Sequence, residues 1–148
     1  MKKKLLFLLS FCLLNGVVLA QKVKSPNGNF VMNFTLDNAG TPTYTLTYKG
    51  KAVVKPSKLG LALIGSEKAE FGTEVKKEKD PKTSLYDGFS VSEIKNASFD
   101  QTWEPVWGET KTIRNHYNEM AVALTQKETE REMIIRFRLF DDGLGFRY

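Results

Sequence analysis

The sequence predicts an all-β protein built from antiparallel sheets, and three observations support this prediction. Apolar and polar residues alternate in several segments, as they do in strands that bury one face. Clusters of turn-forming residues separate these segments at short intervals. After residue 20 we find no convincing helical periodicity, no repeat and no linker that would mark a second domain. We therefore expect one β-domain over residues 21–148.

Residues 1–20 have the pattern of a secretion signal. Three lysines precede an apolar run from Leu5 to Leu14, and Val18–Ala20 offers small residues for cleavage before Gln21. The run is shorter than the roughly 20 residues of a membrane-spanning helix. We therefore expect export to the periplasm, with no membrane attachment after the signal is cleaved.

The charge and cysteine content exclude several classes of function. Residues 1–20 carry three lysines and no acid, so without them Lys and Arg fall from 22 to 19 while Asp and Glu stay at 17. The net charge then falls from +5 to +2, and no clustered basic face remains for nucleic acid. Cys12 is the only cysteine, so the mature chain has no disulfide, thiolate metal site or cysteine nucleophile.

In the first half of the chain we predict a hairpin followed by two short strands. Asn29–Leu36 and Thr43–Tyr48 alternate, with a turn-rich segment between them, and threonines give the hairpin one wet face. Ala52–Val54 is predicted to be a short strand ended by Pro56. Residues 59–63 are predicted to be a strand whose Gly and Ala face must be closely packed.

The second half contains a charged segment and a predicted central strand. Residues 66–84 hold five lysines and five acids without a facial pattern, which indicates a solvated loop or edge strand. Leu85–Phe89 is predicted to be a turn, and an apolar pattern continues to Phe99. Thr102–Glu109 is predicted to be extended and kinked, because it contains Pro and Gly. Ile113–Leu124 ends apolar on both faces, as in a central strand.

The end of the chain is the most apolar hairpin of the sequence. Ile135, Phe137 and Leu139 alternate onto one side, and Arg136 and Arg138 fall on the other. Residues 141–143 are predicted to form the hairpin loop, with Gly143 in a positive-φ conformation. Alternation resumes at Leu144 just before the sequence stops, so we expect this chain to be the front of a longer protein.

Two tryptophans are the candidate ligand-binding residues. Trp103 and Trp107 lie in one unusual segment, and a flat aromatic face suits stacking on a sugar ring. The alternative is that both anchor a core or an interdomain contact, because tryptophan is largely buried on average. We favour the second interpretation and keep sugar binding as the hypothesis to test.

Other reactive side chains do not form a recognisable catalytic set. His116 is the only histidine, so we expect a structural hydrogen bond rather than catalysis or metal binding. Glu104 and Glu109 are expected at the surface or in salt bridges, and Asp141 and Asp142 are explained by turn chemistry. We therefore predict no catalytic and no metal-binding residue in this chain.

Three arginines share one side of the terminal hairpin and need a counter-charge. Arg136, Arg138 and Arg147 would otherwise repel one another. Their partners could be nearby acids, an anion, or an interface with the remainder of a longer protein, and the sequence does not choose between these. The nearby acids are Glu128, Glu130 and Glu132.

Six segments in order resemble the amino-terminal region of glycoside hydrolase family 97, and the resemblance covers about Lys22 to Tyr148. The segments are Ser25-Pro-Asn-Gly-Asn, Thr43-Tyr-Thr-Leu-Thr-Tyr, Leu85-Tyr-Asp-Gly-Phe, Trp103-Glu-Pro-Val-Trp-Gly-Glu, Ile113-Arg-Asn-His-Tyr-Asn-Glu and Phe137-Arg-Leu-Phe-Asp-Asp-Gly-Leu-Gly-Phe-Arg-Tyr148.

The resemblance implies an amino-terminal β-super-sandwich, of which this chain would be a part, followed by a (β/α)₈ catalytic barrel and a small β-domain. Family members hydrolyse α-glucosides or α-galactosides and use a calcium ion in the active site. The catalytic carboxylates belong to the barrel, and the calcium-binding glutamate of the amino-terminal domain is expected beyond Tyr148. The resemblance thus implies that this chain holds no calcium and meets α-linked oligosaccharides only within the full-length protein.

Three hypotheses follow for the chain itself. The first is a supporting domain of an exported, calcium-dependent α-glycosidase, inactive without the missing barrel. The second is a free-standing periplasmic module that binds carbohydrate or another protein. The third is an inactive gene fragment that folds poorly, because a partial sandwich leaves strand edges exposed.

Overall fold

The computed structural model describes residues 21–63 and 84–148, and all regular elements in these ranges are β-strands. The prediction of an all-β antiparallel fold is confirmed. The predicted signal peptide and residues 66–83 of the charged segment lie outside the described ranges. The strands are β1 (Gln21–Lys24), β2 (Phe30–Leu36), β3 (Pro42–Tyr48), β4 (Lys51–Lys58), β5 (Leu61–Ala62), β6 (Ser84–Leu85), β7 (Phe89–Trp103), β8 (Ile113–Gln126), β9 (Glu132–Leu139) and β10 (Leu144–Arg147).

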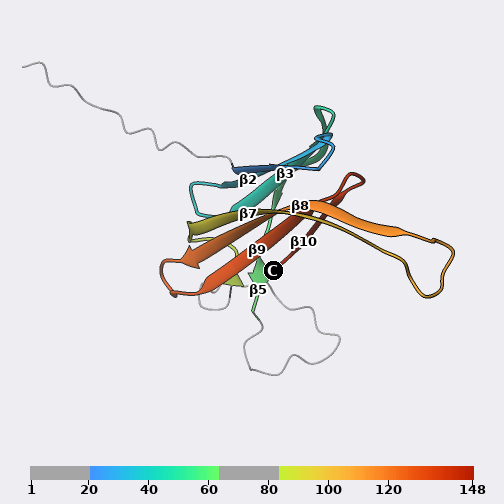
Figure 1. The fold of residues 1–148 in the computed structure, drawn as a ribbon. Coiled ribbons are helices and arrows are strands. Elements are labelled where there is room, and N and C mark those ends of the chain that lie inside the picture. Colours follow the sequence, from blue (N-terminus) through green and yellow to red (C-terminus); the bar gives the residue numbers. More distant parts are fainter. Residues whose placement is uncertain (1–20, 64–83) are drawn as a thin grey trace, which may run out of the picture.

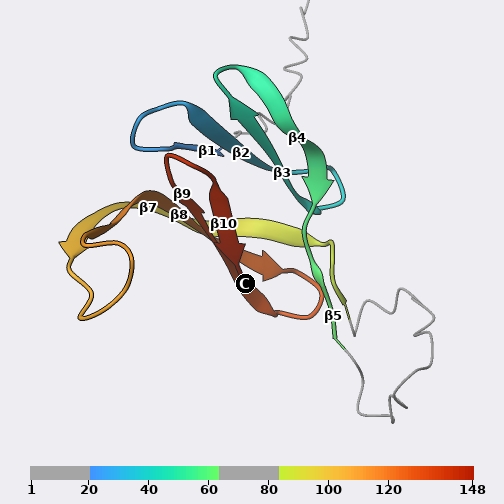
Figure 2. The same cartoon turned by 90° about the vertical axis from the view of Figure 1, so that its right-hand side faces the viewer.

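The strands form two four-stranded antiparallel sheets and one small pair. The first sheet has the order β1-β2-β3-β4, the second sheet has the order β10-β9-β8-β7, and β5 pairs with β6. Figure 1 shows the first sheet, blue to green, lying over the second, which runs from yellow to red. Figure 2 shows the same two layers from the side. Within the described ranges, no helix is long and apolar enough to cross a membrane.

The core lies between the two sheets and uses the alternation that the sequence displays. The first sheet contributes Met32 and Phe34, which are almost fully buried. The second sheet contributes the inward face of β9, where the rings of Phe137 and Phe34 are 5.9 Å apart. The predicted inward faces of 29–36 and 133–140 are confirmed. The other fully inaccessible residues of the core are Val122, Leu124, Ile135 and Leu139.

The first sheet departs from the sequence prediction at its two edges. β1 was not predicted, although its Val23 is buried in the core. Pro56 does not end the strand, because β4 continues to Lys58. β4 is an edge strand with irregular pairing to β3, and a proline is tolerated there because its missing N–H costs no interior ladder bond.

The segment around Gly60 is shorter than predicted but is closely packed as expected. Only Leu61 and Ala62 form a strand. A Cβ atom added at Gly60 would lie 2.8 Å from the carbonyl oxygen of Leu85 and closer still to the ring of Tyr86. The predicted turn at 85–89 therefore provides the close contact that glycine permits.

The longest feature of the fold is the β7–β8 hairpin, which the sequence did not predict in full. β7 has 15 residues and β8 has 14, and they pair from Phe89↔Gln126 to Trp103↔Ile113 with one register shift between Val91 and Glu93. Figure 1 shows the far part of this hairpin running past the end of the first sheet. β8 lies between β7 and β9, so its predicted central position is confirmed.

The terminal hairpin forms as predicted, with a different loop geometry. β9 and β10 pair from Leu144↔Leu139 to Arg147↔Arg136. Residues 140–143 separate the two strands, and the backbone N–H of Phe140 donates to the carbonyl of Gly143 at 2.8 Å, which leaves Asp141 and Asp142 at the tip. Gly143 does not have a positive φ, and that prediction was wrong. None of residues 140–143 has a positive φ, so the chain does not reverse here through the positive-φ two-residue turn for which Gly143 was expected.

Adjacent isoleucines in β9 test which face of the second sheet carries the core. Ile135 is fully buried, whereas Ile134 is 47% exposed. Ile135→Ala is expected to lower the free energy of unfolding by about 2–5 kcal/mol, because it leaves a cavity between the sheets. Ile134→Ala, the matched control, is expected to cost less than about 1 kcal/mol. Urea unfolding followed by circular dichroism measures both, and equal losses would contradict the assignment of faces.

Candidate functional site

The tip of the β7–β8 hairpin carries the two tryptophans. Trp103 is the last residue of β7 and is 44% exposed, and Trp107 lies in the connecting loop and is 89% exposed. Between them, Val106 is 99% exposed. The expectation that both tryptophans belong to a core is wrong within this chain, because the hairpin extends past the sheet that would have covered them. An interdomain contact and sugar stacking both remain compatible with this position.

The two glutamates of the same segment accompany the tryptophans without forming an acid–base pair. Glu104 and Glu109 are both exposed in the loop. Their expected surface location is confirmed. Exposed apolar and aromatic groups next to carboxylates form a surface that can pack against a sugar ring or a protein. They do not form a closed reaction centre.

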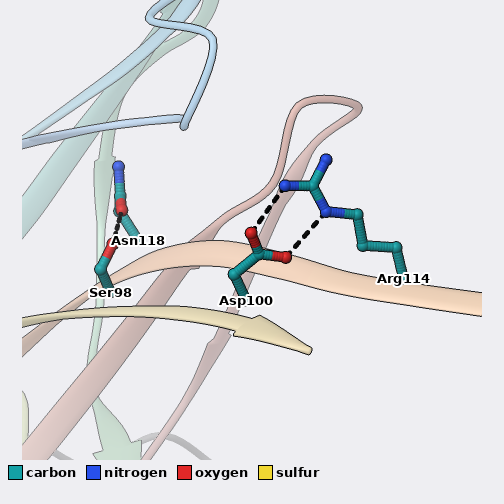
Figure 3. A network of polar contacts seen from close by, with 4 residues as sticks. All are labelled: Ser98, Asp100, Arg114 and Asn118. Carbon is teal, nitrogen blue, oxygen red and sulfur yellow. Dashed lines mark hydrogen bonds and ion pairs between the residues drawn. The ribbon is translucent and has the colours of Figure 1, made fainter. Parts of the chain in front are cut away.

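The stem of the hairpin is held by polar contacts on the side that faces the first sheet (Figure 3). Arg114 on β8 donates two hydrogen bonds to the carboxylate of Asp100 on β7, at 2.6 and 2.7 Å. The Oγ of Ser98 donates to the Oδ1 of Asn118, whose amide in turn donates to the carbonyl of Lys24 on β1. These bonds tie the two strands of the stem to each other and to β1 of the first sheet.

The Asp100–Arg114 pair is ionised over an extended pH range. The two guanidinium hydrogen bonds lower the pKa of Asp100 below its ordinary value, and the same contact raises the pKa of Arg114. The negative charge of Asp141, in the β9–β10 loop, also raises the pKa of Arg114. The Oδ1 of Asp141 accepts a hydrogen bond from the backbone N–H of Asn27 at 2.8 Å. Turn chemistry alone therefore does not explain Asp141, because it also joins the two sheets.

His116 does not have the hydrogen bond that we expected. It lies on β8 opposite Asp100 of β7, inside a strand rather than beside one. In the part of the chain that the structure describes, it forms no hydrogen bond or ion pair. No group of three or more His, Cys, Asp or Glu residues in the described ranges could hold a metal ion.

The outer face of the second sheet, which points away from the first sheet, carries an ion-pair network centred on Glu119. Its carboxylate accepts hydrogen bonds from Arg136 at 2.9 Å and from Arg138 at 2.8 Å. Of the alternatives left open by the sequence, an acid of this chain is the partner of these two arginines, but it is Glu119 and not the candidates Glu128, Glu130 or Glu132. The register places Glu119 of β8 opposite Arg138, whereas residues 128 and 130 lie in the turn before β9.

An aromatic cluster continues from this network toward the hairpin stem. The guanidinium carbon of Arg138 lies 4.5 Å from the ring centre of Tyr117. Tyr117 also stacks on Phe99 and contacts Phe140, with ring centres 5.3 and 5.2 Å apart. The hydrogen bond from Arg138, followed by that from Arg136, lowers the pKa of Glu119 against the opposing effect of burial. Sequence reasoning missed Glu119 because its role depends on strand register.

Acid titration tests the role of Glu119. Since its pKa is lower in the folded chain than its ordinary 4.5, its contribution to stability is present above that pH and is lost as pH falls through the folded value. Glu119→Gln is expected to cost about 1 kcal/mol of unfolding free energy at pH 7. The difference from the unsubstituted chain should shrink toward pH 3. Urea unfolding at several pH values measures it.

Glu132→Gln is the matched control for that titration, because Glu132 is exposed at the start of β9. It is expected to change stability by no more than about 0.5 kcal/mol at any pH. A Glu119→Gln variant that unfolds at the same urea concentration as this control would contradict the network.

Comparisons with known proteins identify what this arrangement is similar to. The family model described as the glycosyl-hydrolase 97 N-terminal domain matches residues 23–148. A glycoside hydrolase family 97 enzyme from Pseudoalteromonas sp. strain K8, solved in complex with panose, superposes with a TM-score of 0.67 at 26% identity. The structure of the family 97 enzyme from this strain with acarbose gives the same values.

A crystal structure of a β-arabinopyranosidase also superposes, with a TM-score of 0.66 at 17% identity, and shows the likeness of fold alone. In each of these comparisons the match covers 85% of this chain and 17% of the other. The chain thus spans about a sixth of the length of the enzymes that it resembles.

Proposed function

This chain belongs to the glycosyl-hydrolase 97 N-terminal domain family, and we propose that it is the supporting domain of an exported α-glycosidase. In this role it braces a catalytic barrel and shapes one wall of a pocket for α-linked oligosaccharides. Hydrolysis and the calcium ion belong to the rest of such an enzyme.

The observation that carries the proposal is the family match over almost all of residues 21–148. The similar enzyme from Pseudoalteromonas was solved with panose and with acarbose, which supports an oligosaccharide substrate for the parent of this chain. The predicted secretion signal supports a periplasmic location, where such substrates would be met.

The projecting hairpin supports a role in contact with the barrel or its substrate. At its tip Trp107 is 89% exposed and Trp103 is 44% exposed. The polar contacts at the stem tie β7 to β8 and β8 to β1, which reduces the conformational entropy that the stem loses when a partner or sugar is contacted. An aromatic anchor on a rigid support is the usual composition of an energetically important contact.

The second candidate function is a free-standing periplasmic carbohydrate-binding or interaction module. The exposure of Trp107 favours it, because a tryptophan at a tip can stack on a sugar without a barrel. The two functions differ in whether the isolated chain binds sugar.

The isolated chain is expected to show no hydrolysis of a nitrophenyl α-glucoside and no saturable change in tryptophan fluorescence with maltooligosaccharides. The physical reason is that one wall of a pocket lacks the opposing groups that hold and cleave a sugar. A saturable fluorescence change would favour the free-standing module, and measurable turnover would contradict both candidate functions.

Within a full-length enzyme that contains this domain, Trp107→Ala is expected to lower kcat/KM for maltooligosaccharides. An aromatic contact of about 1 kcal/mol corresponds to a roughly fivefold loss. Val106→Ala is the matched control, since Val106 is the neighbouring side chain with the greatest exposure. Steady-state kinetics measure both variants. If the Trp107→Ala variant kept the wild-type kcat/KM, the proposed contact of the tip with substrate or barrel would be contradicted.

A further inference from the structure

Three arginines surround a hollow on the outer face of the β9–β10 hairpin. Arg136 and Arg138 extend from β9, and Arg147 lies on β10 directly opposite Arg136. The hollow has a volume of about 160 Å³, and we call it the arginine pocket. Its lining consists of Arg136, Arg138, Phe140, Gly145, Phe146 and Arg147.

The charge of the arginine pocket is only partly balanced within the described part of the chain. Glu119 accepts one hydrogen bond from Arg136 and one from Arg138. Each guanidinium has five N–H donors, so most donors of both arginines remain available. The side chain of Arg147 forms no ion pair or hydrogen bond with the residues that the structure describes. Three cations facing one carboxylate leave a local excess of two positive charges.

Gly145 gives the pocket an open floor. It lies directly opposite Arg138 in the β9–β10 ladder, so both residues face the same side of the sheet. A Cβ atom added at Gly145 would meet no atom within 4 Å. Neither a positive φ nor packing therefore requires glycine here, and the space above its backbone stays free.

We infer that the arginine pocket binds a carboxylate from outside the described part of this chain. A planar carboxylate matches the paired N–H groups of a guanidinium, and Arg147 can present such a pair. The excess positive charge favours an anion, and the volume admits one carboxylate with its adjoining carbons. An acidic side chain of a polypeptide and the carboxyl group of a uronic acid share this chemistry. The inference does not depend on the proposed function.

Titration of the full chain with two carboxylate probes tests the inference. Glucuronate and the peptide triglutamate are added at constant ionic strength, and the side-chain Nε–Hε signals of arginine are followed by NMR. A saturable shift of the Arg147 signal, with a dissociation constant on the order of millimolar, is expected for at least one probe. Sodium chloride at matching ionic strength is the control for screening.

Two substitutions locate the binding. Arg147→Gln is expected to weaken binding at least about tenfold. Arg147→Lys is expected to weaken binding less, because lysine keeps the charge but loses the paired N–H donors of the guanidinium. Gly145→Val is expected to fill the pocket and abolish binding. Gly143→Val is its matched control, because a Cβ atom there also meets no atom within 4 Å but Gly143 does not line the pocket. Far-UV circular dichroism checks that each variant is folded.

The outcomes separate cleanly. Tighter binding of glucuronate assigns the pocket to an acidic saccharide, and tighter binding of triglutamate assigns it to an acidic polypeptide segment. Both results support a carboxylate site. The inference is overturned if neither probe gives a saturable shift, if chloride reproduces the shift, or if Gly145→Val and Arg147→Gln bind like the unsubstituted chain.

Discussion

The packing of one apolar face of each sheet against the other is the constraint on which the rest of this structure depends. Phe137 of β9 lies at its centre, with ring contacts to Phe34 and Tyr44 of the first sheet and to Phe146 of β10. Because side chains alternate along a strand, fixing the inward face of β9 also fixes which residues point outward. The arginines and Glu119 lie on the outer face for this reason.

The second consequence of this packing is that β7 and β8 are longer than the sheet they pack against. Near Met120 they bury apolar side chains, but toward the tip they continue as a two-stranded ribbon. A two-stranded ribbon has little stability of its own in water. The Asp100–Arg114 ion pair and the bond from Asn118 to Lys24 supply local support where the core ends.

Strand alternation could be predicted from the sequence, and contacts between strands could not. The inward faces of 29–36 and 133–140 follow from a local pattern, and the structure confirms them. The partner of Arg138 depends on the register between β8 and β9, which no local pattern reveals. The length of β7 was missed because most of its residues are exposed on both faces, so it has little hydrophobic alternation. The positions of Trp103 and Trp107 were missed for the same reason.

The two sheets differ in the chemistry of their outer faces. The outer face of the first sheet carries Thr43, Thr45 and Thr47, which are half-buried and whose hydroxyls form hydrogen bonds within that sheet and its turns. The outer face of the second sheet carries the Glu119 network, the aromatic cluster and the arginine pocket. Charged and aromatic groups on an uncovered face are costly to order without a partner. In the proposed function, the first sheet is the support on which the second sheet carries these charged and aromatic groups.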